Sequence, residues 1–184
     1  MSRAIMSPHE RAPLEGIFAS ETVQQFVHIM QAVAMSNINE MRAEALAYSS
    51  KNPSISILSA FRTCIGCVRK WDRTIIVTER EVWKQRYGQL EGLMRQTCEK
   101  CVRAYDRVEG VRENGMRIPP LGDFLYFFLN NFVVSADVVN MAVFDQPEYI
   151  VQASVARAVR QTILDCITML YYPEKLVYVQ KQSS

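Results

Sequence analysis

The chain has 184 residues, of which 49% are hydrophobic, 22% are charged and 10% are aromatic, and its net charge is +2. This is the composition of one ordinary globular domain, so it excludes a disordered or fibrous chain. A mean hydropathy of -0.05 excludes a polytopic membrane protein. Seven glycines and seven prolines are too few for a barrel or sandwich of many short strands.

Charge is distributed unevenly along the chain. Residues 62–117 carry a net charge of +5, whereas residues 1–61 carry -1 and residues 118–184 carry -2. Charges of both signs are interleaved in the middle segment, which is typical of a solvated helical surface. We expect such a surface first, and contact with a polyanion second.

The N-terminal part predicts an arm followed by a long helix. Residues 1–19 contain two prolines and no apolar period, which indicates an extended arm. Ser20 is a good N-cap residue, and apolar residues follow it at helical spacing as far as Tyr48. Polar residues at 36–39 are a candidate interruption of this helix.

A break and a second helix come next. Residues 49–54 include Pro53 and separate the first helix from the second. Apolar residues spaced three and four apart then predict a helix from Ile57 to near Arg73.

The following stretch predicts one further long helix. Residues 74–78 are a β-branched run, and Thr78 with Glu81 matches a capping box. Behind that box a single apolar stripe continues to Gly110, so we expect an uninterrupted helix over this range.

Two more helices are expected in the C-terminal part. A double proline opens the segment 119–134, which is apolar nearly all round and therefore predicts the central buried helix. Asp145 and Glu148 form another capping box, and the helix behind them is expected to end before Pro173.

These elements predict an all-α fold, a single-domain bundle of five or six helices. An extended arm at 1–19 precedes a helical domain at 20–172, and a tail at 173–184 follows, in which 175–180 is a short strand or extended. The N-terminus has no apolar signal segment, and the most apolar window, 124–134, is too short to cross a bilayer. We therefore expect an intracellular chain with no membrane span, not a secreted one.

The feature that rises above this background is an internal duplication. The segment 63–73 reads TCIGCVRKWDR, and the segment 97–107 reads TCEKCVRAYDR. Seven of the eleven positions are identical, and Trp71 is matched by Tyr105. We expect the two segments to share a physical role and to lie side by side.

The duplication contains two C-x2-C pairs, which is the ligand set and spacing of a structural zinc site. One zinc ion would be bound by the sulfur atoms of Cys64, Cys67, Cys98 and Cys101. If the two helices pack antiparallel, disulfides joining Cys64 to Cys101 and Cys67 to Cys98 are the second interpretation. Four small buried core residues are the third.

The same segments repeat a basic pattern. Arg69 and Arg73, and again Arg103 and Arg107, are spaced four residues apart and so lie on one helix face. With the aromatic residues of the repeat able to stack on bases, this pattern fits a zinc-stabilised nucleic-acid-binding hairpin. Ion pairs within the chain, or contacts to a partner protein, are the alternative.

No catalytic motif accompanies the cysteines. The two histidines, His9 and His28, lie in no recognisable motif, and Asp72 and Asp106 each precede an arginine and read as ion-paired. Phosphate-binding glycine loops, nucleophile elbows and zinc-protease patterns are absent from the sequence. We therefore expect a protein that is not an enzyme.

The segment IPPLGDFLYFFLNNFVVSAD at 118–137, with the capped helix that ends in DCI at 165–167, resembles small proteins of large icosahedral DNA viruses. Some of these are similar to minor capsid components, and the resemblance covers about 50 residues of the C-terminal part. It implies a non-enzymatic structural role, helix-mediated contacts, location in the virion and a setting that permits disulfides.

The sequence thus predicts a helical interaction protein built into a larger assembly with other protein subunits, and the resemblance implies that it is a viral minor capsid component. The alternative is a zinc-stabilised regulatory protein that binds nucleic acid. In the first case we also expect the arm at 1–19 and the tail at 173–184 to dock on partners.

Overall fold

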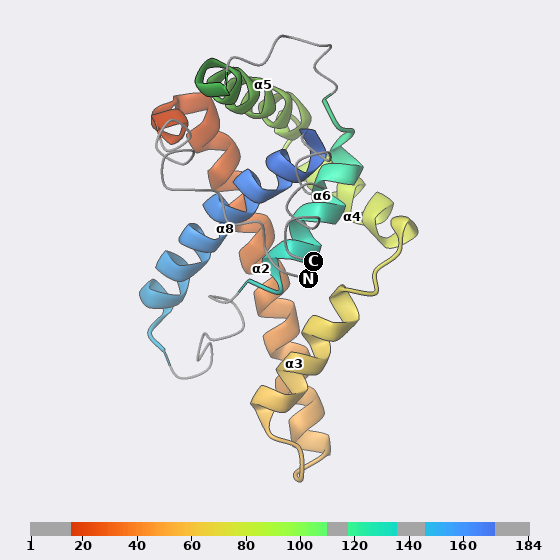
Figure 1. The fold of residues 1–184 in the computed structure, drawn as a ribbon. Helices are drawn as coiled ribbons and strands as arrows, with labels where there is room; N and C mark the ends of the chain where they lie inside the picture. Colours follow the sequence, from red (N-terminus) through yellow and green to blue (C-terminus); the bar gives the residue numbers. More distant parts are fainter. Residues whose placement is uncertain (1–15, 110–117, 136–145, 172–184) are drawn as a thin grey trace, which may run out of the picture.

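A computed structural model describes residues 16–109, 118–135 and 146–171 of the chain (Figure 1). Every regular element within these ranges is a helix, which confirms the all-α prediction. In chain order the elements are η1 (Gly16–Ala19), α2 (Glu21–Lys51), α3 (Ile57–Val68), α4 (Arg73–Arg86), α5 (Leu90–Glu109), α6 (Leu121–Phe132) and α8 (Glu148–Tyr171).

The 31-residue helix α2 is the element around which the others pack. It contacts α3, α5, α8 and η1, and it runs through the molecule from one end to the other (Figure 1). Ser20 is its N-cap residue as predicted, although the Ser20 hydroxyl accepts a hydrogen bond from Lys100 of α5 and caps no helical N–H. The interruption considered at 36–39 is absent, and the Asn37 amide instead donates to the Val33 carbonyl (3.0 Å) within the continuous helix.

Helix α6 is the buried central helix that its sequence predicts. Its apolar side chains point into the core on every turn, and the buried ones are Leu121, Phe124, Leu125, Phe128, Leu129 and Phe132. Phe124, Phe128 and Phe132 stack along the helix with ring centroids 6.4 and 5.7 Å apart, and Phe26 of α2 meets Phe124 edge-on at 5.6 Å. Such pairs contribute about 0.5–1.5 kcal/mol each beyond area burial. The Phe26–Phe124 pair joins α6 to α2, and the main packing partners of α6 are α4 and α8.

The long helix predicted from Thr78 to Gly110 is wrong in two respects. The helix begins earlier, at Arg73, and residues 87–89 divide it into α4 and α5. The true N-cap of α4 is Asp72, whose Oδ1 atom accepts hydrogen bonds from the backbone N–H groups of residues 74 (2.8 Å) and 75 (3.1 Å). Asp72 is therefore a helix cap, a role that the sequence analysis did not assign to it.

The β-branched run at 74–78 is helical because tertiary contacts outweigh its low helix propensity. Ile76 and Trp83 are buried on the side of α4 that packs against α6. Trp83 also stacks on Tyr87 with ring centroids 6.1 Å apart, and its indole N–H donates to Glu79 (3.0 Å). These contacts and the Asp72 cap hold a segment that would be a poor helix alone.

The boundaries of the helical body differ from the prediction at the N-terminal end. Residues 16–19, assigned to the arm, form the short helix η1 that packs against α2 and α5. Ile17 and Phe18 are half-buried against the core, so the described body begins at residue 16 and not at 20. The remaining arm, the Asp145 cap, and the tail with its expected strand at 175–180 lie outside the described residues.

Helices α2 and α3 form an antiparallel hairpin that projects from the rest of the molecule (Figure 1). Among the described elements, α3 packs extensively against α2 alone. The shared interface contains Phe61, Ile65 and Val68 of α3 and the apolar stripe of α2 near Met41 and Ala45. The outer surface of this hairpin is thus left uncovered by the rest of the described chain.

We predict that Asp72→Ala lowers the free energy of unfolding by about 1 kcal/mol, because two N–H groups at the start of α4 lose their acceptor. For a chain of this size that corresponds to a fall of about 3 °C in the melting temperature. Thermal unfolding followed by circular dichroism measures it. Asp72→Asn, which keeps a capping oxygen, should lie within a few tenths of a kcal/mol of the unchanged protein. An equal loss in both variants would contradict the capping role.

Candidate functional site

The two copies of the duplicated segment have different secondary structure. Residues 63–73 span the end of α3, a turn and the first residue of α4. Residues 97–107 lie wholly within α5. The same eleven-residue pattern therefore ends one helix and starts another in the first copy, and continues a single helix in the second.

The two copies also differ in burial. Thr63 is exposed, Cys64 is half-buried and Cys67 is exposed, whereas Thr97, Cys98 and Cys101 are all buried. Only two described pairs match: Val68 and Val102 are buried, and Arg69 and Arg103 are exposed. Trp71 is half-buried against the core, and the side chain of its counterpart Tyr105 is outside the described set. What the copies share is the orientation of the helix, with Val inside and Arg outside.

The expectation that the two segments lie side by side is wrong. Cys64 lies beside Glu44 near the C-terminal end of α2, whereas Lys100 of α5 bonds to Ser20 at the N-terminal end. Ser20 and Glu44 are separated by about 36 Å of helix at 1.5 Å per residue, and α3 and α5 lie at opposite ends of the molecule (Figure 1).

The cysteine interpretations change accordingly. The pair Cys64 and Cys67 and the pair Cys98 and Cys101 do not meet, so they cannot be the ligands of one metal site within this chain. None of the five cysteines, Cys166 included, is in a disulfide, so neither of the two expected disulfides is present. In the described ranges, no group of three or more His, Cys, Asp or Glu side chains could hold a metal ion.

Burial sets the ionisation of these thiols. It raises the pKa of Cys101 to about 12, with a smaller contribution from neighbouring Cys98, and raises that of Cys166 well above its ordinary value. Burial also raises the pKa of Cys64, and the adjacent Glu44 and Cys67 add to the rise. Since the thiolate is the nucleophilic form, these environments do not favour thiol catalysis.

Thr97 is a buried polar residue without a partner. Its hydroxyl is fully buried in α5 and makes no hydrogen bond within the described structure. In the other copy, the hydroxyl of Thr63 is exposed and donates to the Ser59 carbonyl (3.1 Å). The second copy therefore keeps the threonine of the repeat at a position where its hydroxyl has no hydrogen-bond partner among the described residues.

The four arginines predicted as a contact surface do not form one patch. Arg69 is the C-cap residue of α3, at the base of the hairpin. Arg103 lies within α5. Both side chains are exposed. The side chains of Arg73 and Arg107 lie outside the described set. The fold therefore does not bring the two repeats together as a single basic hairpin.

The projecting α2–α3 hairpin carries the apolar surface that sequence reasoning missed. Leu46, Tyr48 and Leu58 are large apolar residues that remain 44%, 51% and 42% exposed on it. Single exposed apolar residues are ordinary, but three on one two-helix projection indicate a contact surface. Helical periodicity places Tyr48 on the apolar stripe of α2 and so predicts that it is buried. Its exposure becomes visible only in the folded structure.

The hairpin has two flanks, one on each side of the α2–α3 interface. On α3, Leu58, Arg62 and Arg69 lie at i, i+4 and i+11 along one side of the buried stripe, and Cys64 and Cys67 lie along the other. Cys64 adjoins Glu44, which lies on the opposite side of α2 from Leu46. We call Leu46, Leu58, Arg62 and Arg69 the basic flank, and Cys64 and Cys67 the cysteine flank.

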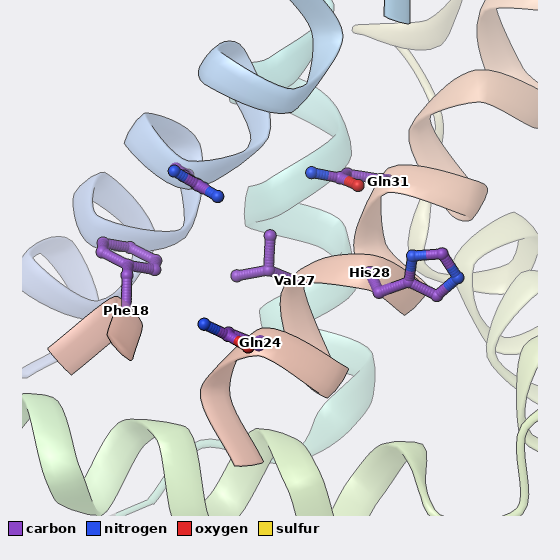
Figure 2. Close-up of a pocket in the computed structure, with 6 residues that line it drawn as sticks. Phe18, Gln24, Val27, His28 and Gln31 are labelled. Carbon is purple, nitrogen blue, oxygen red and sulfur yellow. The ribbon is translucent and has the colours of Figure 1, made fainter. Parts of the chain in front are cut away.

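A shallow hollow of about 230 Å³ lies between η1, α2 and α8. Figure 2 shows Phe18, Gln24 and Gln31 reaching toward it, whereas the His28 ring points away. The Arg160 guanidinium lies 5.9 Å from the centroid of the Phe18 ring. The lining contains no carboxylate and no thiol, so it offers no acid–base pair or nucleophile for a reaction.

Comparison with known proteins adds no family. No protein-family model matches the sequence, and no curated protein or solved structure is significantly similar to it. Over the described ranges, none of the helices is both long and apolar enough to cross a membrane. The function is therefore argued from the surfaces above.

We predict that Thr97→Val raises the free energy of unfolding by about 1 kcal/mol, because it removes a buried hydroxyl that lacks a hydrogen bond. Thr63→Val, at the matched position of the other repeat, is the control and should change it by less than about 0.5 kcal/mol. Urea unfolding of both variants measures the difference. A loss of stability in Thr97→Val comparable to a core defect would mean that the hydroxyl has a partner.

We also predict that the protein loses stability from pH 9 toward pH 12. An unfolded Cys101 thiol ionises near its ordinary pKa of 9.0, whereas the folded one keeps its proton to about 12, so ionisation favours the unfolded chain in this window. Each such thiol lowers the free energy of unfolding by about 1.4 kcal/mol per pH unit. Cys101→Ala should reduce the slope by that amount, and Val102→Ala should not. Equal slopes in all three proteins would contradict the prediction.

Proposed function

We propose that this chain is a non-enzymatic interaction subunit of a larger assembly, and that it binds a partner protein through the basic flank of the α2–α3 hairpin. The observation that carries the proposal is the projection of a hairpin whose second helix packs on α2 alone. Two apolar residues, Leu46 and Leu58, stay more than 40% exposed on this flank. Burying such side chains against a partner contributes about 25 cal/mol per Å² of apolar surface removed from water.

The charge of α3 defines the chemistry of the partner. The helix and the turn after it, residues 57–70, contain Arg62, Arg69 and Lys70 and no acidic residue. All three basic side chains are exposed, and neither of the two ion pairs recorded for the described residues involves them. The matching surface is an amphipathic helix of the partner, with leucine-like residues flanked by carboxylates.

The resemblance of residues 118–137 to virus structural proteins supports a place in a virion, as a minor capsid component. Helix α6 of that segment is buried at the centre of the fold. In this proposal it supports the fold from within, and the hairpin makes the contact. The arm at 1–19 and the tail at 173–184 remain further candidate contacts of the same assembly.

Binding of nucleic acid is the rival function. It draws support from the exposed Arg69 and Arg103, but Arg69 follows α3 at the base of the hairpin and Arg103 lies on α5, so the two are not joined in one basic hairpin. The exposed leucines of the basic flank favour a protein partner, because phosphate contacts require cations and gain nothing from apolar neighbours.

The test is a double substitution, Leu46→Glu with Leu58→Glu, in the full chain expressed in its native source. Glu is about as good a helix former as Leu, so the melting temperature should stay within about 2 °C. The fraction of the chain that sediments with high-mass assemblies should fall at least tenfold. Val82→Glu, at a 52% exposed position on α4, is the matched control and should assemble normally.

Nuclease and salt distinguish the rival. A protein-bound chain stays in the high-mass fraction after nuclease treatment and through moderate salt, whereas phosphate contacts weaken steeply with salt. The proposal is overturned if nuclease releases the chain, if the double variant assembles as well as the unchanged protein, or if the unchanged chain sediments only as a free monomer.

A further inference from the structure

The cysteine flank of the hairpin is a half-site for a metal ion. Cys64 and Cys67 lie three residues apart on α3, a spacing that puts their Cβ atoms about 5–6 Å apart on one helix face. Two thiolates on a tetrahedral zinc ion, with Zn–S bonds of about 2.3 Å, have sulfur atoms about 3.8 Å apart. Cys67 is exposed, Cys64 is half-buried, and neither is in a disulfide.

The other two ligands must come from outside this chain. A structural zinc site needs four ligands, and within the described residues Cys64 and Cys67, even with Glu44 beside them, do not form a group of three side chains that could hold the ion. The remaining C-x2-C pair is buried near the other end of α2. A second copy of the hairpin supplies an identical pair, and a twofold axis through the metal completes the tetrahedron.

We propose that two copies of the chain pair through their cysteine flanks around one zinc ion bound by Cys64 and Cys67 of each copy.

The outward surface of α3 permits a second helix to approach closely. Ser59, Thr63 and Cys67 are small and exposed. They are spaced four residues apart, so they form one ridge of short side chains along α3. Such a ridge lets the α3 helices of two copies pack close to each other.

Charge fits the same arrangement. Four thiols lose four protons when they bind one Zn²⁺ ion, which leaves a centre with a charge of about −2. Lys70 follows Cys67 by three residues and is exposed, so the two copies bring two ammonium groups to this centre. Glu44 is the opposing group, because its carboxylate adjoins Cys64 and accepts the thiol proton as a hydrogen bond in the metal-free chain. That hydrogen bond is replaced by the Zn–S bond.

The experiment titrates ZnCl₂ into the reduced, metal-free, full-length chain and follows mass by light scattering and native mass spectrometry. We expect one zinc ion per two chains, a doubling of mass on metal addition and a return to monomer with a chelator. Cobalt(II) in place of zinc should give the intense absorption of a four-thiolate tetrahedral site.

Three variants distinguish the proposed site from its alternatives. Cys67→Ser should abolish both metal binding and the mass change, whereas Cys101→Ala, at the matched position of the other repeat, should keep both. Thr63→Leu enlarges an exposed residue that lies one turn before Cys67 and should leave folding intact, but it should weaken zinc-dependent pairing at least tenfold because it blocks the close approach.

Four outcomes overturn the proposal: one zinc ion per monomer, no zinc bound at micromolar metal, a dimer that persists in chelator, or metal binding that survives Cys67→Ser. The inference concerns the cysteine flank and does not depend on the partner proposed for the basic flank. The zinc-linked dimer is measured with the purified chain alone, so its failure and the failure of the assembly role are separately visible.

Discussion

The length of α2 is the constraint on which the rest of the structure depends. Its 31 residues make a rod of about 46 Å at 1.5 Å per residue, and its buried stripe runs from Val23 to Ala45. Exposure of so long an apolar stripe to water is unfavourable, so other elements must cover it along its whole length. Near Val23 several helices cover the stripe, whereas near Ala45 the described helix that covers it is α3. The body and the projecting hairpin are thus two ways in which the chain covers one helix.

The sequence predicted the helices whose apolar pattern is local and strong, and it failed where capping chemistry competes. The segment that became α6 is apolar on nearly all sides, so its burial could be predicted from the sequence. The boundary at α4 was misplaced because Thr78 and Glu81 match a capping box, while Asp72 provides a stronger cap six residues earlier. The break at 87–89 was missed because the apolar residues keep their helical spacing across Gly88. Periodicity alone does not reveal an interruption that leaves this spacing unchanged.

The duplication shows why a candidate site is harder to predict than a helix. The repeated pattern fixes which side of each helix is apolar, and Val68 and Val102 are buried at the same position of the two copies. Where each helix then docks depends on residues elsewhere in the chain, and α2 is long enough to accept the two copies at different ends. The zinc prediction, which was based on the spacing of four cysteines, therefore assumed that the two cysteine pairs lie close together, and they do not. The exposed Leu46 and Leu58 were missed for the same reason, because exposure is a property of the whole fold.

A hairpin held by one helix–helix interface is the part of such a fold that opens at the lowest free energy, because few buried contacts cross to the body. Several features of its surface make it less stable still in a lone chain. Gly66 lowers the helix propensity of α3. Leu46 and Leu58 leave apolar surface exposed to water. Arg62 and Arg69 lie on one flank, and their own helix contains no carboxylate. Each feature becomes favourable only when a second surface is present: a close helix for the glycine, an apolar face for the leucines and an anionic rim for the arginines. A surface whose residues are individually unfavourable for the monomer, and jointly suited to contact, is what a chain built for assembly would present.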